Sequence, residues 1–181
     1  MNPLALLEKY YPPGSQGHAI LLEHSLAVAA KAEAIARRLG PQLVDADFVR
    51  EAALLHDIGI CYTSAPELGC NGALPYLAHG YKGRELLEAE GLPRHALVCE
   101  RHIGVGLTAE EITSQELPVP PRDMLPLSVE EQIVTYADLF FSKDPAAGHR
   151  ERQAERVRES LARFGAEKVA VFDGWHRRFA G

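Results

Sequence analysis

Apolar residues recur with the period of an α-helix along most of this chain, and Gly and Pro clusters separate the periodic segments. In the first part of the chain we expect helices over about His18 to Leu39, Ala46 to Ile58, His79 to Glu90 and Pro93 to His102. Gly40-Pro41 should stop the first of these helices, and Gly59 should stop the second. This half of the chain is therefore predicted to be helical.

The second half of the chain shows the same period. Thr108 opens a short segment with a capping-box pattern, T-x-x-E, which is typical of a helix start. Further helices are expected over about Ser128 to Phe141, Glu151 to Phe164 and Ala166 to Phe179. No segment alternates apolar and polar residues over a useful length, so the predicted fold class is all-α, a single-domain helical bundle.

Composition fits a soluble globular domain. The chain has 181 residues, of which 46% are hydrophobic and 24% are charged, with a net charge of −6. That charge argues against an extended nucleic-acid surface, although a bound metal ion could still attract a small anion. The three cysteines form no CxxC pair, which favours free thiols. With no signal-peptide pattern and no long apolar run, we expect a cytoplasmic protein without a membrane segment.

Two acidic residues occupy apolar settings that ordinarily exclude charge. Asp57 lies in ALLHDIG, and Asp138 lies in IVTYADLFF. An unpaired carboxylate buried among such side chains costs several kcal/mol or more, so a bound cation is the economical explanation. Neighbouring residues on a helix do not face each other, so His56 and Asp57 could share one ion only where their helix ends.

Imidazole ligands are available from other predicted helices. His24 lies on the first long helix, and Asp138 would approach from a later one. A site that mixes imidazole and carboxylate suits Fe, Mn, Co, Ni or Zn better than magnesium, which prefers oxygen ligands alone. We therefore expect a divalent transition metal held by His24, His56, Asp57 and Asp138.

The order His24, His56-Asp57, Asp138, with the local string HDIG, resembles the HD superfamily of metal-dependent phosphohydrolases. The resemblance covers about residues 18–143, and it implies one HD-type domain over residues 1–181 with a C-terminal helical extension over about 149–180. It also implies an enzyme that hydrolyses a phosphate ester or anhydride of a nucleotide or similar small phosphorylated molecule by metal-bound hydroxide. Asp57 would orient the attacking water.

Two more histidines, His79 and His102, lie between the HD pair and the last aspartate. The resulting order, H…HD…H…H…D, resembles HD subgroups that hold two metals, among them cyclic-dinucleotide phosphodiesterases and symmetrical dinucleoside-tetraphosphate hydrolases. By that resemblance His24, His56 and Asp138 would hold one ion, His79 and His102 the other, and Asp57 would bridge them. The HD-GYP phosphodiesterases carry Gly-Tyr-Pro, whereas Lys82 follows Gly-Tyr here, so the substrate stays open.

Three cations are candidates to contact the substrate phosphate. Lys82 follows His79 by three residues and should share its helical face, which also makes it a catalytic candidate. Arg101 adjoins His102, and Lys143 follows Asp138 by just over a turn. The remaining histidines, His18, His95, His149 and His176, are expected at the surface.

Other interpretations remain open. His79 and His102 could bind substrate around a single ion, so the number of ions is one or two. Asp138 could simply be a buried acid bonded to a hydroxyl such as that of Tyr136. The whole domain could be a non-catalytic metal- or nucleotide-binding regulatory module, or a di-iron oxygenase of the same fold. The stripe of Val169, Phe172, Trp175 and Phe179 is either core or a seam that allows a homodimer.

Overall fold

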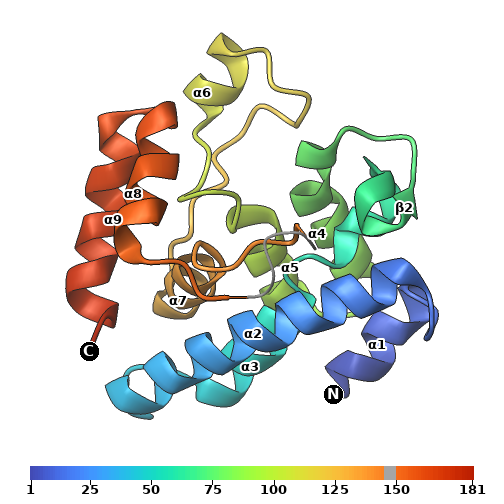
Figure 1. Ribbon diagram of the computed structural model, residues 1–181, viewed down its shortest axis with the longest axis horizontal. Helices are drawn as coiled ribbons and strands as arrows, with labels where there is room; N and C mark the ends of the chain where they lie inside the picture. The colour runs from blue at the N-terminus through green and yellow to red at the C-terminus, as the bar shows by residue number, and fades with distance from the viewer. Residues whose placement is uncertain (145–149) are drawn as a thin grey trace.

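A computed structural model describes residues 1–144 and 150–181, which form a helical bundle with one small hairpin (Figure 1). The α-helices are α1 (Pro3–Tyr10), α2 (Gln16–Leu39), α3 (Ala46–Leu55), α4 (His79–Ala89), α5 (Pro93–Arg101), α6 (Ala109–Ser114), α7 (Val129–Asp138), α8 (Ala154–Leu161) and α9 (Ala166–Phe179). The short elements are η1 (Ile58–Tyr62), β1 (Ser64–Ala65), η2 (Pro66–Leu68), β2 (Cys70–Asn71), η3 (Tyr76–Ala78) and η5 (Ala162–Phe164). The predicted all-α class is confirmed.

Most helices begin at a side-chain cap that can be found in the sequence. Ser15 accepts a hydrogen bond from the backbone N–H of His18, which starts α2 two residues before the expected position. At α6, the hydroxyl of Thr108 and the carboxylate of Glu111 exchange hydrogen bonds with each other's backbone N–H, so the capping box is confirmed. Ser128 caps α7 in the same way as Ser15 caps α2.

Three features differ from the sequence-based expectation. Helix α1 is additional, and it has a cap at Asn2 and a proline in its first turn. Helix α3 ends at Leu55 rather than Ile58, so Gly59 does not stop it but lies inside η1. The hairpin of β1 and β2 pairs two residues per strand, which is too short to produce a visible alternation.

Two clusters of buried apolar side chains hold the bundle together. The first lies among α2, α3, α7, α8 and α9, and the second lies among α1, the start of α2, η1, α4 and α5. In Figure 1, α8 and α9 lie side by side on one flank of the bundle. Phe172, Trp175 and Phe179 of α9 are at most 9% exposed and belong to the first cluster, so this stripe is core within the chain. A homodimer stays a prediction.

Helix α2 runs along both clusters, because Leu21 belongs to the second cluster and Val28 belongs to the first. His24 lies between these two positions on the helix and is fully buried. The end of α3 has the same character, since Leu54 packs in one cluster and Leu55 in the other, immediately before His56. The polar residues of interest therefore lie at the junction of two apolar cores.

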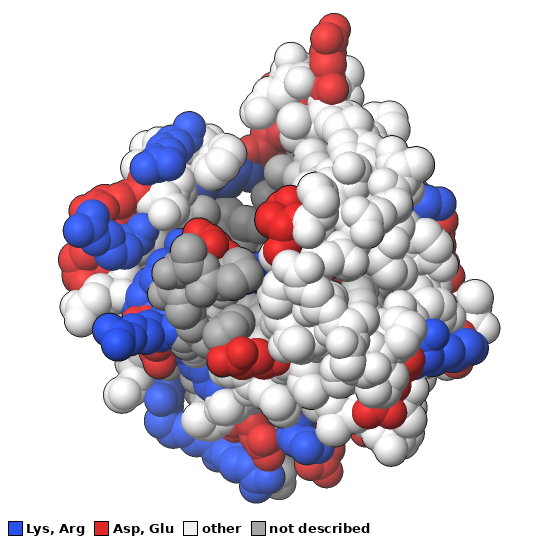
Figure 2. Space-filling model, turned by 45° about the vertical axis from the view of Figure 1, so that its right-hand side comes forward, with Lys and Arg blue, Asp and Glu red and all other residues white. Residues whose placement is uncertain are grey.

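The surface shows no long basic strip on the face drawn in Figure 2, where Lys and Arg side chains are interspersed with Asp and Glu. Among the described residues, no helix combines the length and apolar character needed to cross a lipid bilayer.

Candidate metal centre

The end of α3 is where His56 and Asp57 come to share one site. His56 keeps a helical backbone, but Asp57 has φ −105° and ψ 7°, outside the helical region. The Nε2 atom of His56 lies 3.1 Å from Oδ2 of Asp57, so the change of backbone direction lets both side chains reach the same point. The expectation that the helix must end at this pair is confirmed, three residues earlier than predicted.

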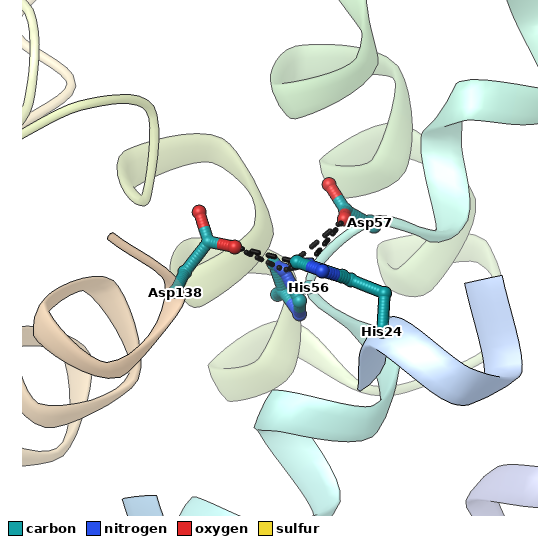
Figure 3. A group of neighbouring side chains, drawn as sticks. All are labelled: His24, His56, Asp57 and Asp138. Carbon is teal, nitrogen blue, oxygen red and sulfur yellow. Dashed lines mark hydrogen bonds and ion pairs between the residues drawn. The ribbon is translucent and has the colours of Figure 1, made fainter. Parts of the chain in front are cut away.

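Two other helices complete a first group of donor atoms around this pair (Figure 3). From α2, Nε2 of His24 lies 3.3 Å from Nε2 of His56 and 3.3 Å from Oδ2 of Asp57. From the last residue of α7, Oδ1 of Asp138 lies 3.0 Å from Nε2 of His24 and 3.3 Å from that of His56. His24 and His56 are fully buried, and Asp138 is 14% exposed.

A second group forms on the other oxygen of the Asp57 carboxylate. His79, the first residue of α4, and His102, which caps the end of α5, place their Nε2 atoms 3.2 Å apart. These atoms lie 3.5 and 3.4 Å from Oδ1 of Asp57. Asp57 thus presents Oδ2 to one group and Oδ1 to the other, which is the arrangement of a bridging carboxylate.

The spacing of these donor atoms suits coordination of a divalent ion. Neighbouring ligand atoms at about 2.0–2.2 Å from an octahedral or tetrahedral ion lie about 2.8–3.6 Å from one another. The donor pairs given above are separated by 3.0 to 3.5 Å in both groups. Both carboxylate oxygens of Asp57 and Oδ1 of Asp138 are buried without a well-formed hydrogen bond among the described residues, which also fits a cation. The residues present therefore fit one ion in each group.

Backbone carbonyls orient three of the four imidazoles. The Nδ1 atoms of His56, His79 and His102 each lie 2.7 Å from the carbonyl oxygen three residues earlier in the chain. In the neutral ring, a hydrogen on Nδ1 that donates to this carbonyl leaves the lone pair on Nε2, the nitrogen beside Asp57. Three separate segments thus repeat one local geometry, and each presents Nε2 to the same carboxylate.

The charges at the centre shift the pKa of its members in opposite directions. Burial lowers the pKa of His79 to about 3, which keeps that imidazole neutral. Burial also opposes the charged form of His56, but the carboxylates of Asp57 and Asp138 outweigh it and raise the pKa to about 10. The same burial would raise the pKa of Asp57, yet His56 and Lys143 hold it well below its usual range.

Lys143 is the candidate phosphate contact that the structure brings to the centre. Its Nζ atom lies 2.8 Å from Oδ2 of Asp57 and 3.7 Å from Oδ1 of Asp138, and its side chain is only 16% exposed. The two carboxylates raise the pKa of this ammonium group against the effect of burial. A positive charge therefore lies beside the first group of donor atoms.

The other two candidate cations are directed elsewhere, which corrects the sequence-based assignment. Lys82 does follow His79 on α4, but its ammonium group pairs with Glu85 at 2.6 Å on the outer side of that helix. Arg101 adjoins His102, yet its guanidinium contacts both carboxylate oxygens of Glu131 at 3.0 and 3.1 Å. Successive residues of a helix point in different directions, so adjacency to His102 did not place Arg101 in the site. The three-residue spacing from His79 did not place the Lys82 ammonium group there either.

Other expectations about histidines and Asp138 are also resolved. His95 is buried rather than at the surface, because its ring packs against Phe48 and its Nε2 atom lies 3.3 Å from Glu51. His18 and His176 are partly exposed, and His149 lies outside the described residues. The hydroxyl of Tyr136 pairs with His176 at 2.8 Å and is thus not the partner of Asp138.

A cavity of about 430 Å³ opens beside the centre, lined in part by Asp138, Lys143, Tyr76 and Arg152. Sequence reasoning missed the last two. Tyr76 supplies the carbonyl that holds His79, and its ring lies 4.8 Å from that imidazole. The guanidinium of Arg152 donates to the carbonyl of Leu139 at 2.5 Å, while its buried Nε–H has no partner among residues 1–144 and 150–181. The three-residue spacing of Tyr76 and His79 could have identified the first, but nothing in the sequence identifies Arg152.

Comparisons with known proteins agree with this geometry. The family model described as HD domain matches residues 21–141. The chain is 40% identical over 121 residues to an uncharacterized protein of Methanocaldococcus jannaschii, covering 65% of this chain and 64% of that protein. It is 31% identical over 168 residues to a protein of Thermoplasma volcanium named tRNA (cytidine(56)-2'-O)-methyltransferase, covering 92% of this chain and 42% of that protein.

The chain thus spans less than two thirds of the length of either relative. Similarity over part of the second relative does not assign methyltransferase activity to this chain. Among solved structures, the HD domain of the Listeria monocytogenes phosphodiesterase PgpH, in complex with cyclic-di-AMP, matches with a TM-score of 0.55. That match covers 95% of this chain and 94% of the other at 19% identity, and it shows a shared fold. Given the match over residues 21–141 and the His/Asp centre, this chain belongs to the HD domain family.

Proposed function

We propose that this protein is a metal-dependent phosphohydrolase that cleaves a phosphate ester or anhydride of a nucleotide or similar small phosphorylated molecule. The observation that carries the proposal is the Asp57 carboxylate, which faces a buried donor group on each of its two oxygens. Paired metal sites of this kind recur in enzymes that catalyse displacement at phosphorus.

The proposal assigns the first ion to His24, His56, Asp57 and Asp138, and a second ion to Asp57, His79 and His102. Bound divalent ions of Fe, Mn, Co, Ni or Zn would polarise the phosphoryl group and lower the pKa of water. The pKa of Asp57 is held well below its usual range, so the carboxylate stays ionised and can accept a hydrogen bond from a water molecule. In this proposal Asp57 therefore both holds metal and orients the nucleophile.

The residues around the 430 Å³ cavity would bind the substrate phosphate. Lys143 carries a positive charge at the cavity wall, and its raised pKa keeps it charged at any physiological pH. Arg152 contributes a guanidinium at the same wall, and its Nε–H is unpartnered within the part of the chain that the structure describes. Phosphoryl transfer depends largely on positioning and charge stabilisation, which these two cations could supply to oxygens that do not react. Lys82 and Arg101 have no part in this proposal, because carboxylates outside the centre neutralise them.

A nucleotide substrate is favoured by size and by analogy. A cavity of several hundred Å³ is typical of small-molecule sites. The structurally similar PgpH HD domain was solved with cyclic-di-AMP. Because the Gly-Tyr-Pro of the HD-GYP phosphodiesterases is Gly-Tyr-Lys here, we place cyclic dinucleotides beside nucleoside monophosphates and dinucleoside polyphosphates as substrates to be compared.

The proposal is tested with chain purified without chelator, loaded with Mn(II) or Co(II), and assayed against those three substrate classes. Wild type should release product from at least one class, and Asp57→Ala should release none. Lys82→Ala is the matched surface control and should behave as wild type. Flat profiles for wild type and Asp57→Ala alike would refute hydrolysis. Two bound ions with no turnover would instead favour a regulatory binding module, and metal-dependent oxygen uptake would favour an oxygenase.

A further inference from the structure

Helix α4 contacts η1 through one glycine from each element, Gly83 and Gly59, rather than through side chains. A Cβ atom added to Gly83 would overlap the sulfur of Cys99 on α5, and it would lie 3.2 Å from the backbone nitrogen of Gly59 in η1. A Cβ atom added to Gly59 would overlap the carbonyl oxygen of His79, and it would lie 2.8 Å from Cα of Gly83. The backbones of η1 and α4 thus touch directly, and a thiol closes the contact from α5.

This contact lies between the two groups of donor atoms. The thiol of Cys99 donates to the carbonyl oxygen of His56 at 2.9 Å, and the carbonyl of Cys99 accepts from Nδ1 of His102 at 2.7 Å. Cys99 is fully buried, and through these two hydrogen bonds it contacts His56 of the first group and His102 of the second. On the other side of Gly83, the chain leads back one helical turn to His79.

Of the six donor residues, only His79 lies on α4. His24, His56 and Asp138 come from α2, the end of α3 and α7, whereas His79 is the first residue of α4. Because the Cys99 thiol is fully buried and held by its hydrogen bond to the His56 carbonyl, an overlap at position 83 is expected to displace α4, and metal–ligand distances tolerate a displacement of only about 0.2 Å. A methyl group at this position should therefore disturb one group of donors and leave the other intact.

We propose that Gly83 and Cys99 are positioning residues that set the distance between the two metal groups, so that a side chain at position 83 selectively weakens the second. The inference rests on the proposed two-metal function. It concerns residues that touch neither metal nor substrate and that act by fixing where His79 lies relative to Asp57 and His102.

The test compares Mn(II) binding and Mn(II) electron paramagnetic resonance in four proteins. Gly83→Ala should keep one ion and bind the second about 10- to 100-fold more weakly, and the spectrum of a coupled Mn pair should give way to that of isolated ions. Gly83→Ala/Cys99→Ala removes the overlapping sulfur, so it should regain the second ion and the coupled spectrum. Gly174→Ala is the matched control in α9, where the nearest atom to an added Cβ is 4.0 Å away, and it should match wild type.

The possible failures separate the inference from the proposed function. Wild type that binds fewer than two ions overturns the inference and the two-ion assignment, while product release still decides hydrolysis. If Gly83→Ala binds two ions with wild-type affinity, only the positioning role is overturned. If wild type binds two ions but shows no phosphohydrolase activity, only the proposed function is overturned. If Gly83→Ala does not fold, the double variant decides. Recovery of two ions supports the role, and a double variant that stays unfolded or binds one ion contradicts it.

Discussion

The bridging position of Asp57 predicts how metal-dependent stability divides among the ligands. Asp57→Asn keeps the size of the side chain but removes the charge that faces both donor groups. Asp138→Asn alters only the first group, and His102→Gln alters only the second. A bridging carboxylate therefore predicts that one substitution abolishes both metal contributions, whereas each of the other two abolishes one.

The magnitude follows from binding linkage. An ion that binds only the folded chain, at a free concentration of about 100 Kd, adds about 2.7 kcal/mol to the free energy of unfolding, and two such ions add about 5.4 kcal/mol. For a chain of 181 residues each kcal/mol raises Tm by about 2–4 °C. Metal loading should therefore raise Tm by about 11–22 °C in wild type and about 5–11 °C in Asp138→Asn or His102→Gln, but by less than about 3 °C in Asp57→Asn.

The assay is thermal unfolding followed by circular dichroism in EDTA and in Mn(II), with metal content measured on the same samples. The metal-free curves provide the control, because each variant is compared with itself and a change in intrinsic stability cancels. The reasoning is refuted if Asp57→Asn keeps half or more of the wild-type metal-dependent rise, or if His102→Gln loses all of it.

Three further outcomes are expected. Lys143→Met should lower kcat/KM by at least about tenfold with metal content unchanged, and Lys82→Met should have no effect, as measured by steady-state kinetics and elemental analysis. His56 has a pKa of about 10 without metal, so metal binding at the first group should release about one proton from His56. The metal affinity of that group should therefore rise about tenfold per pH unit between about pH 7 and 9. His79 has a pKa of about 3 and should release no proton. Calorimetry in buffers of different ionisation enthalpy measures this release, and equal heats in all buffers would contradict it. Tyr11→Phe should lower the free energy of unfolding by about 1–3 kcal/mol and lower Tm, because it removes a buried hydroxyl that donates to the carbonyl of Ile58 and accepts from the N–H of Cys61. An unchanged thermal unfolding curve would contradict this.

The sequence predicted the helices from local signals, and it predicted the His/Asp centre from acidic residues in apolar segments together with a family resemblance. The caps at Ser128 and Thr108 can be identified from the three or four residues at the start of each helix. An aspartate in an apolar helix is similarly informative, because burial of an unpaired carboxylate is costly wherever the helix packs. The resemblance of HDIG and of the order His24, His56-Asp57, Asp138 to the HD pattern then joined the first group in one hypothesis.

Features that depend on packing between distant segments were not predictable in this way. Gly59 resembles a helix stop in the sequence, but its small size serves a contact with α4, whose partner Gly83 is 24 positions later. Lys82 was expected beside His79 from helical spacing alone, yet the outward direction of its side chain depends on how α4 packs. Lys143 reaches the centre only because the chain leaves the helical path after Asp138.

The account depends most directly on two cations being held on either side of one carboxylate. Crystals grown with Mn(II) and measured at the manganese absorption edge would show this as anomalous peaks. We predict two peaks about 3.5–4 Å apart, with Asp57 between them, one beside His24, His56 and Asp138 and the other beside His79 and His102. A map with no peak at these residues, or with a peak that Asp57 does not contact, would contradict the account.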